Sequence, residues 1–543
     1  MTNAPVSAGL NAIDLGVFLF YMAATVALGF WVARRGKSKP RDYFLGGNTL
    51  PWYVIATSMV ATNVSSEHFI ANVGASYKHG IVVATGSWNS WIIYSLLIWV
   101  FLPYYLRSRI FTMPQFLEQR YNSTCRYLFA WITTVGYIFG IIAGGLYAGG
   151  LALQSMFGMD MTMGILLLAV ATGAYTIYGG LVSAAWTDFM QMIVLIVGAV
   201  LVPVLGMMKA GGLVSLAQAH PEKFQVFLPP DHPLFPVTGI FTGFLSIGIW
   251  YSCTNQLIVQ RCLGAKDEWH ARVGVVAAGF LHTITPLFFT VPGIIAYKLY
   301  PNLEKPDSAY LVLVKDLIPS GLRGLVLAAI AAALMSTLST VLNSTSTVLT
   351  IDFYKKLLRP DASDEAQVRF GRWSGAIVLL IGAALGWVYA QRQDQSLFVL
   401  ITTVFAYIAP PFAVIFTLGL LWRRGNAVGA AATIVAGIIF STLLHQYLFP
   451  HIALIRPYNS PHHRALACWV FSMIVMISVS LATPAPAPEK TDGIIWNPRY
   501  AKLPDVLKEK YHGIRDWRLW WLLFIGTILS LYAFLFWFQA QHR

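Results

Sequence analysis

Long apolar blocks, each about long enough to cross a bilayer, recur along the whole chain. A helix needs about 20 mostly apolar residues to span the hydrocarbon core of a membrane. Fourteen such blocks can be counted, at residues 12–33, 50–77, 80–106, 127–157, 161–179, 181–208, 236–260, 273–299, 321–352, 373–391, 397–422, 425–449, 465–483 and 517–540. The sequence therefore predicts an all-α polytopic membrane protein of about fourteen helices, forming one transmembrane domain over residues 1–543.

Charged residues are too few to cover a soluble surface. They make up 11% of the chain, against roughly 25% in soluble domains. The formal net charge of +14 does not predict nucleic-acid binding, because the basic residues lie in short loops between apolar blocks, as topology signals do. The four cysteines follow neither a disulfide nor a zinc-site spacing. Because no acidic cluster, metal motif or phosphate-binding loop stands out, an enzyme is not expected.

The distribution of basic residues predicts the orientation in the membrane. The loops that follow odd-numbered blocks carry 26 of the 37 lysines and arginines. Basic loops stay on the cytoplasmic side, so we expect both termini on the outer side of a plasma membrane. Short outer loops and the lack of a disulfide pattern favour a bacterial inner membrane. The long polar segment at 484–516 is assigned no chemistry.

Polar residues interrupt the second apolar block between Val60 and Phe69, where six of ten residues are polar. Polar groups are costly in lipid and normally face a protein interior or a watery cavity. Ser, Thr and Asn also bond to nearby backbone groups, which favours a broken helix. A broken helix frees carbonyls that can ligate Na⁺. A continuous helix whose hydroxyls bond back to its own carbonyls is the alternative.

The ninth block carries a stripe of hydroxyl-rich side chains. At helical spacing, Ser336, Ser339, Thr340, Asn343 and Thr347 share one face. Hydroxyl oxygens suit a dehydrated monovalent cation, so the stripe predicts ion ligation. The alternative is a small-residue face for close helix packing.

Three further polar positions lie in apolar surroundings. Asp188 is the only acid in the sixth block, where it either serves a buried site or caps the helix start at the interface. Tyr251 lies in a Gly- and aromatic-rich part of the seventh block, which either covers a ligand or packs against neighbours. His282 precedes Pro286 in the eighth block and forms a kinked polar spot.

Several motifs make the chain resemble the sodium:solute symporter family, within it the sodium/glucose cotransporter branch. They are Asp42 to Asn48, Thr112 to Leu117, Tyr175 to Asp188, Gln256 to Cys262 and Ala333 to Tyr354. The resemblance extends from about Arg41 to Trp422. It implies a LeuT-type fold, with inverted five-helix repeats at 50–208 and 236–422, a leading helix at 12–33 and three additional helices at 425–540.

The resemblance also implies sodium as the coupling ion. The family's sodium site corresponds here to the carbonyls of Ala61, Val64 and Ala333 and the hydroxyls of Ser336 and Thr337. Some members resemble a two-sodium pattern. A possible second sodium would be held by Asp188, Ser336, Ser339 and Thr340.

The substrate site is only partly similar to that of the sugar cotransporters. The candidate contacts are Asn63, Glu67, His68, Ser87, Asn89, Ser90, Tyr251, His282, Phe398 and Thr402. Asn63 and His68 look like their sugar-cotransporter counterparts, and Tyr251 matches an aromatic inner gate. Ser87, His282 and Thr402, however, stand where that branch usually has Glu, Lys and Gln.

The function implied is sodium-coupled symport of a small polar organic solute by alternating access, with a sugar or sugar-like compound favoured. A sodium symporter for an amino acid, organic acid or other metabolite is one alternative, and a non-transporting sensor with the same fold is another. The expected partners are the solute, Na⁺ and the lipid bilayer, with no obligate protein partner. Glu67, His68 and His282 leave a proton contribution to coupling open.

Overall fold

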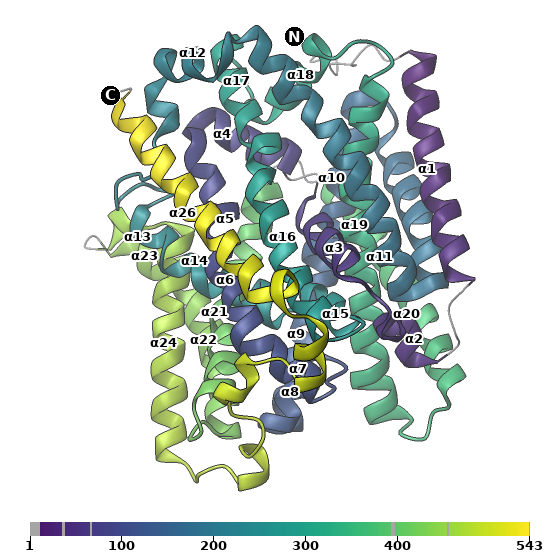
Figure 1. The fold of residues 1–543 in the computed structure, drawn as a ribbon, viewed down its shortest axis with the longest axis vertical. Helices are drawn as coiled ribbons and strands as arrows, with labels where there is room; N and C mark the ends of the chain where they lie inside the picture. Colours follow the sequence, from purple (N-terminus) through teal and green to yellow (C-terminus); the bar gives the residue numbers. More distant parts are fainter. Residues whose placement is uncertain (1–10, 35–38, 66–67, 392–396, 453–454, 542–543) are drawn as a thin grey trace.

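The computed structural model describes residues 11–34, 39–65, 68–391, 397–452 and 455–541, without the side chains of 155–157 and 397–406. In these ranges the regular elements are helices, accompanied by two isolated β-bridges. The prediction of an all-α protein is therefore confirmed. Figure 1 shows most helices running along the long axis of the molecule, with α1 and the end of α26 reaching the same end.

The helices fall into long and short segments. The long ones are α1 (Ala12–Ala33), α9 (Ser123–Gly136), α10 (Ala143–Phe157), α11 (Met161–Lys209), α16 (Glu268–Phe289), α19 (Arg323–Val348), α20 (Asp364–Gln391), α21 (Leu397–Leu421), α22 (Ala427–Leu443), α24 (Pro461–Ala482) and α26 (Trp517–Gln541). The short ones are α2 (Pro40–Leu45), α3 (Trp52–Asn63), α4 (Val73–His79), α5 (Thr85–Trp88), α6 (Ser90–Leu96), α7 (Leu102–Arg107), α8 (Met113–Arg120), α12 (Gly212–Ala219), α13 (Val237–Ile240), α14 (Gly243–Gly248), α15 (Gln256–Leu263), α17 (Val291–Leu299), α18 (Ala309–Leu317), α23 (Phe449–His451) and α25 (Asp505–Lys510).

Eleven stretches of the described chain are long and apolar enough to cross a membrane. The two longest have about the length of two crossings, since His68–Arg107 has 40 residues and Met161–Lys209 has 49. The structure thus agrees with a protein that spans the membrane many times. The count of fourteen spans stays a prediction, because apolar blocks and helical stretches do not correspond one to one.

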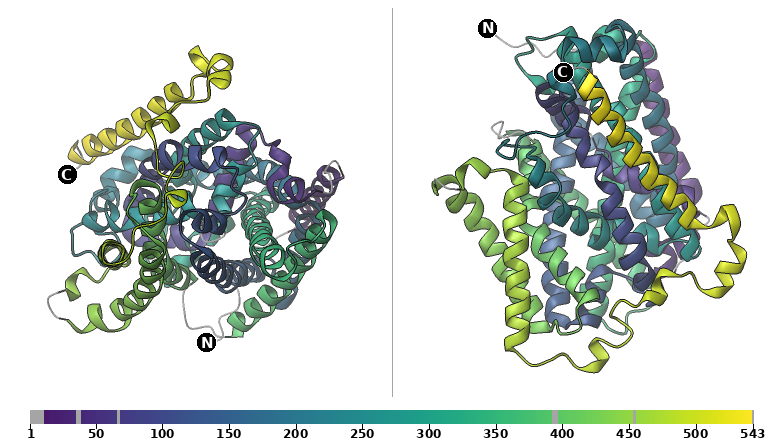
Figure 2. Two further views of the ribbon diagram at one scale, coloured as in Figure 1. Left: turned by 90° about the horizontal axis from the view of Figure 1, so that it is seen from below. Right: turned by 60° about the vertical axis from the view of Figure 1, so that its left-hand side comes forward.

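The helix α19 forms the centre of the bundle. In the stretch that contains it, 89% of the apolar window is buried, against 17% for α26. The glycines and alanines of α11 let α19 approach closely, and a Cβ at Gly198 would lie 2.7 Å from the Ala329 side chain. Figure 2 shows α26 crossing obliquely on the outside of the bundle. The central helix is therefore the one that carries the hydroxyl stripe.

Two helices are interrupted at positions that serve the site. The helix α3 ends at Asn63, and Val64 is extended with φ −84° and ψ 113°. The chain resumes as a helix at His68. In the second half, a π-helical turn ends at Thr254, Asn255 is extended with φ −85° and ψ 131°, and α15 begins at Gln256. The polar run around Thr62 therefore correctly predicted a break in the second block, and the structure adds a corresponding break at Asn255 in the seventh.

The fifth and sixth blocks join at a sharp bend inside α11. Gly180 has φ 61° and ψ −148°, which are not helical values. A Cβ at this position would lie 2.2 Å from the Tyr43 carbonyl oxygen. Only glycine fits both the positive φ and the close approach, and the bend occurs at the predicted division between the two blocks.

Candidate functional site

A cavity of about 320 Å³ lies beside the break at the end of α3. Its polar lining includes Asn63 and His68, which flank the break, Ser87 and Ser90 of α5 and α6, and His282 of α16. Its other lining residues are Asn72, Ala75, Val83, Thr85, Gly86, Ile93, Tyr94, Phe235, Ile240, Phe244, Ile247, Gly248, Tyr251, Ser252, Pro461 and His462. None of the lining residues that the structure describes is charged.

Hydrogen bonds hold several lining groups in place. The Tyr94 hydroxyl lies 3.2 Å from His282 Nδ1 and accepts from Asn63 Nδ2 at 3.4 Å. His68 Nδ1 accepts from the Ser65 N–H at 3.2 Å, so a neutral His68 carries its proton on Nε2. The Thr285 hydroxyl donates to the His282 carbonyl at 2.8 Å and reaches Ser87 Oγ at 3.4 Å. The cavity thus presents oriented, uncharged donors and acceptors.

Six of the ten predicted substrate residues line this cavity: Asn63, His68, Ser87, Ser90, Tyr251 and His282. The structure places Asn89 elsewhere, since its Oδ1 accepts from the Tyr532 hydroxyl of α26 at 2.8 Å. Glu67 lies outside the described residues, as do the side chains of Phe398 and Thr402.

Sequence reasoning missed Tyr94 and three further lining residues, Phe235, Phe244 and His462. Tyr94 lies four residues after Ser90 and seven after Ser87, on one helical face, so that spacing was an available signal. Phe235 precedes α13, Phe244 belongs to α14 and His462 belongs to α24. No sequence pattern relates these three positions to the others.

The predicted sodium ligands meet where the end of α3 packs against α19. The Ser336 hydroxyl lies 2.7 Å from the Ala61 carbonyl oxygen and 3.0 Å from that of Ala333. The Thr337 hydroxyl lies 3.0 Å from the Ala333 carbonyl oxygen and 3.2 Å from that of Thr62. Val64 is fully buried at the break. Four of the five predicted residues are in direct contact, and the Thr62 carbonyl joins them.

This group of oxygens fits a small monovalent cation. It consists of uncharged backbone carbonyls and two hydroxyls, which are hard ligands without the carboxylates that divalent ions normally require. At present each hydroxyl donates to the carbonyls across the gap. Because a hydroxyl can rotate and turn its lone pair toward a cation, these residues remain the predicted ligands of a sodium ion.

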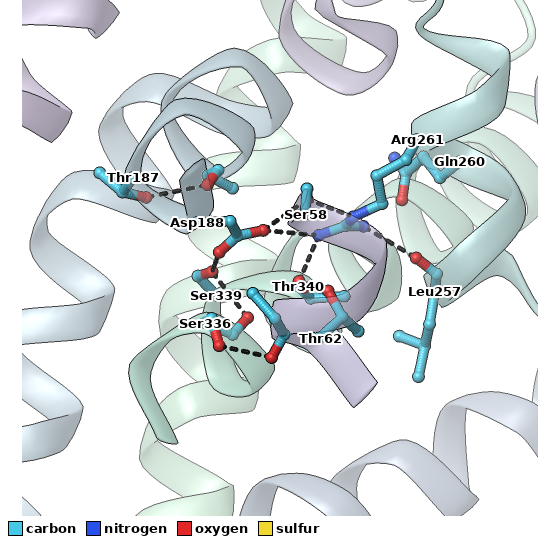
Figure 3. A network of polar contacts seen from close by, with 12 residues as sticks. Ser58, Thr62, Thr187, Asp188, Leu257, Gln260, Arg261, Ser336, Ser339 and Thr340 are labelled. Carbon is cyan, nitrogen blue, oxygen red and sulfur yellow. Dashed lines mark hydrogen bonds and ion pairs between the residues drawn. The ribbon is translucent and has the colours of Figure 1, made fainter. Parts of the chain in front are cut away.

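The predicted second sodium site is occupied by an arginine side chain (Figure 3). Asp188 Oδ2 accepts from the Ser58 hydroxyl at 2.6 Å and lies 3.7 Å from Arg261 Nη2. Ser339 Oγ is 3.5 Å from Asp188 Oδ1. The side chains of both Asp188 and Arg261 are completely buried. The carboxylate therefore has its counter-charge inside the protein.

Arg261 is itself held on three sides. Its Nε donates to Ser58 Oγ at 3.1 Å, its Nη1 donates to the Leu257 carbonyl at 2.9 Å, and its Nη2 donates to Thr340. Thr340 in turn lies 2.8 Å from the Thr62 hydroxyl. Of the four predicted ligands of a second ion, Ser339 and Thr340 join the Asp188 network, whereas Ser336 belongs to the first site.

The placement of Arg261 in a loop was wrong. The bounds of the apolar blocks put Arg261, and likewise Arg120, Arg126 and Arg272, in the basic loops between predicted spans. All four are buried. Arg261 lies within α15 and pairs with a buried acid, which is the way in which a protein accommodates a charge away from water. Hydropathy alone places such a residue at the end of a span.

Ionic contacts bring Glu268, Arg107 and Arg272 together in one cluster. Glu268 contacts Arg107 at 3.0 Å and Arg272 at 2.5 Å. The 484–516 segment packs against this cluster, because Arg272 donates to the Tyr500 carbonyl at 2.6 Å. Arg126 forms a separate pair with Asp352 at 2.7 Å.

Comparisons with known proteins agree on one family. The model of the sodium:solute symporter family matches residues 43–437. The sodium/glucose cotransporter of Vibrio parahaemolyticus is 32% identical over 516 residues, covering 88% of this chain and 91% of that protein. The sodium/myo-inositol cotransporter of Canis lupus familiaris is 31% identical, covering 89% and 75%.

Solved structures agree on the fold. A Na⁺-coupled sialic acid symporter, in a substrate-bound outward-open state, superposes with a TM-score of 0.77 at 22% identity, covering 88% of this chain and 99% of that one. Mhp1, a nucleobase-cation-symport-1 family transporter in a closed conformation, gives a TM-score of 0.54 at 13% identity, with coverages of 84% and 98%. These likenesses establish a LeuT-type fold.

Proposed function

The chain belongs to the sodium:solute symporter family, and from that premise we propose that it carries one small, uncharged, polyhydroxylated solute into the cell with sodium. The favoured class is a sugar or a cyclic polyol. The cavity supports this class, because its described lining offers hydroxyl, amide and imidazole groups and no charge. An amino acid or organic acid would bring charges that this lining does not balance.

One structural link carries the coupling proposal. Asn63 lines the cavity, while the neighbouring carbonyls of Ala61 and Thr62 contact the hydroxyls of the sodium site. Sodium bound there would fix the end of α3 and so orient Asn63 toward the solute. A ligand that stabilises one conformation raises the affinity of a second ligand that binds the same conformation. By thermodynamic linkage, the second ligand raises the affinity of the first by the same factor.

We propose one sodium ion per cycle, held by Ala61, Val64, Ala333, Ser336 and Thr337. At the second predicted site, another cation would lie beside the Arg261 guanidinium that already faces Asp188. Two positive charges so close together repel each other strongly in a site that excludes water. A second ion at Asp188, Ser339 and Thr340 would therefore require Arg261 to move away.

The sodium dependence of uptake is expected to have a Hill coefficient close to one. Radiolabelled solute uptake into proteoliposomes, measured over a range of external sodium concentrations at fixed membrane potential, gives this value. A coefficient approaching two would favour the second site at Asp188.

The proposed orientation places both termini outside a bacterial inner membrane, with repeats at 50–208 and 236–422 and flanking helices at 12–33 and 425–540. One observation supports the repeats, since the breaks at Val64 and Asn255 lie in the first helix of each proposed repeat. The orientation rests on the basic residues of the loops that follow odd-numbered blocks. We propose transport without catalysis and without an obligate protein partner.

A thermal-shift panel tests the solute class. We expect one sugar or cyclic polyol to raise the melting temperature of the purified protein in sodium but not in potassium. A ligand at a hundred times its Kd stabilises the folded state by about 2.7 kcal/mol. Amino acids and organic acids belong in the same panel, and a sodium-dependent shift with one of those alone would support the alternative class.

His282→Asn is expected to raise the KM for the solute roughly 10- to 100-fold, because one oriented hydrogen bond in the cavity is lost. The sodium affinity should change little. Asn89→Ala is the matched comparison, since Asn89 contacts Tyr532 rather than the cavity. If both variants raise KM equally while remaining folded, the assignment of the cavity is wrong.

A further inference from the structure

A second and larger cavity, of about 720 Å³, lies outside the transport pathway described above. It is a groove between α1, α2, α20 and the bend of α11, at the edge of the helix bundle (Figure 1). Its polar and aromatic lining includes Arg34, Arg369 and Arg372 with Tyr178 and Trp373. Neither the sodium site nor the solute cavity uses any of these residues.

The three arginines give the groove a net positive charge. Within the described part of the chain, none of them lies within 4.0 Å of a carboxylate, and all three are exposed. The groove also contains two acids, Asp42 and the exposed Glu365, which lies one helical turn before Arg369. Asp42 Oδ2 is buried, so three exposed arginines face one exposed acid.

One arginine is positioned rather than free to swing. Arg372 Nη2 donates to the Tyr178 carbonyl at 3.2 Å. Its guanidinium carbon also lies 5.3 Å from the centroid of the Tyr178 ring and 5.7 Å from that of Tyr43. Such stacking lowers the mobility of the side chain and leaves the other N–H groups of its planar fork available for a phosphate.

Apolar side chains continue from the groove along the outside of the bundle. Trp31 is 53% exposed on α1, and Trp373 and Ile377 are 66% and 53% exposed on α20. Tryptophan is characteristic of membrane interfaces, where it lies at the level of the lipid headgroups. A soluble anion would use only the arginines, whereas a lipid would also use this apolar surface.

We propose that this groove binds an anionic phospholipid, with the phosphate at Arg34, Arg369 and Arg372 and the acyl chains along α1 and α20. Basic grooves between membrane helices recognise anionic headgroups in this way. The arginines follow the first and precede the tenth predicted spans, so the lipid would belong to the cytoplasmic leaflet. It would also rest against the joint formed by α2 and Gly180.

Native mass spectrometry of the full-length protein in detergent tests the proposal. Phosphatidylglycerol is titrated against phosphatidylcholine with identical acyl chains. We expect one phosphatidylglycerol to bind at least tenfold more tightly than phosphatidylcholine. Loss of two surface arginines at about 1 kcal/mol each predicts about 30-fold weaker phosphatidylglycerol binding for R369Q/R372Q.

Control variants distinguish lipid binding at the groove from attraction to any positive charge on the protein. K355Q/R359Q removes two exposed charges from the same side outside the groove and should bind phosphatidylglycerol like the wild type. Arg34→Gln alone should weaken phosphatidylglycerol binding about fivefold. This single variant still tests the proposal if R369Q/R372Q misfolds. Equal binding of both lipids, or equal effects of the two double variants, would overturn the proposal. Competition by sn-glycerol 3-phosphate at the lipid's own concentration would also overturn it, in favour of a soluble-anion site.

Discussion

Replacing Ser336 and Thr337 together by alanine is expected to abolish sodium-driven uptake. Both hydroxyls bridge α19 to the carbonyls at the end of α3, and they are the only side-chain ligands of the proposed sodium site. Losing two such ligands at about 1.5–3 kcal/mol each weakens sodium binding by at least about 100-fold. The sodium-dependent rise in melting temperature should disappear together with sodium-driven uptake in proteoliposomes.

A matched variant on the same helix shows whether this effect belongs to the site. Thr345 and Thr350 are also buried in this helical stretch, and their hydroxyls donate to the Val341 and Ser346 carbonyls one turn back. T345A/T350A should therefore keep its sodium response. If S336A/T337A is folded and still shows a sodium-dependent shift at the wild-type concentration, the sodium site lies elsewhere.

Asp188→Asn is expected to destabilise the protein more than any other single conservative change. The substitution keeps the shape of the side chain but leaves the Arg261 guanidinium, completely buried, without its counter-charge. Removing one partner of a buried ion pair costs about 3–5 kcal/mol. Thermal unfolding of the purified protein in one detergent, with and without sodium, measures the loss.

The double variant D188N/R261Q separates the ion pair from the packing. Removing both charges should restore much of the stability lost by D188N, because no isolated charge remains buried. Arg261→Lys keeps the charge but cannot reach Ser58, Leu257 and Thr340 at once, so an intermediate loss is expected. Additive losses in the double variant would mean that the two residues act independently.

The sequence was most informative where polar residues occur inside apolar segments. The run around Thr62 predicted a broken helix, and the hydroxyl stripe of α19 predicted a site that faces that break. Both predictions depend on the high cost of placing polar groups in lipid, because such groups must then find partners inside the protein. The Gly179-Gly180 division was likewise visible, because the φ of 61° with ψ of −148° found at Gly180 is a conformation that glycine alone adopts readily.

Other features depend on distances that sequence patterns do not contain. Arg261 was assigned to a loop because hydropathy ends a span at the first charge, although α15 continues beyond it. Its partner Asp188 lies on a different helix, and their pairing follows from how the two repeats dock. The part of the cavity lining that comes from Phe235 and His462 has the same origin, since only the packing of α24 brings distant segments to one cavity.

The buried Asp188–Arg261 pair has a consequence for biogenesis. A ribosome adds ~5–20 residues per second, so the roughly 70 residues between the two positions take several seconds to make. Until Arg261 has been made and α15 has docked against α11, Asp188 is without its partner. Each half of the pair alone costs about 2.5–3.5 kcal/mol in lipid. We therefore expect the first half of the chain to be less stable in the membrane until α15 docks and the two charges pair.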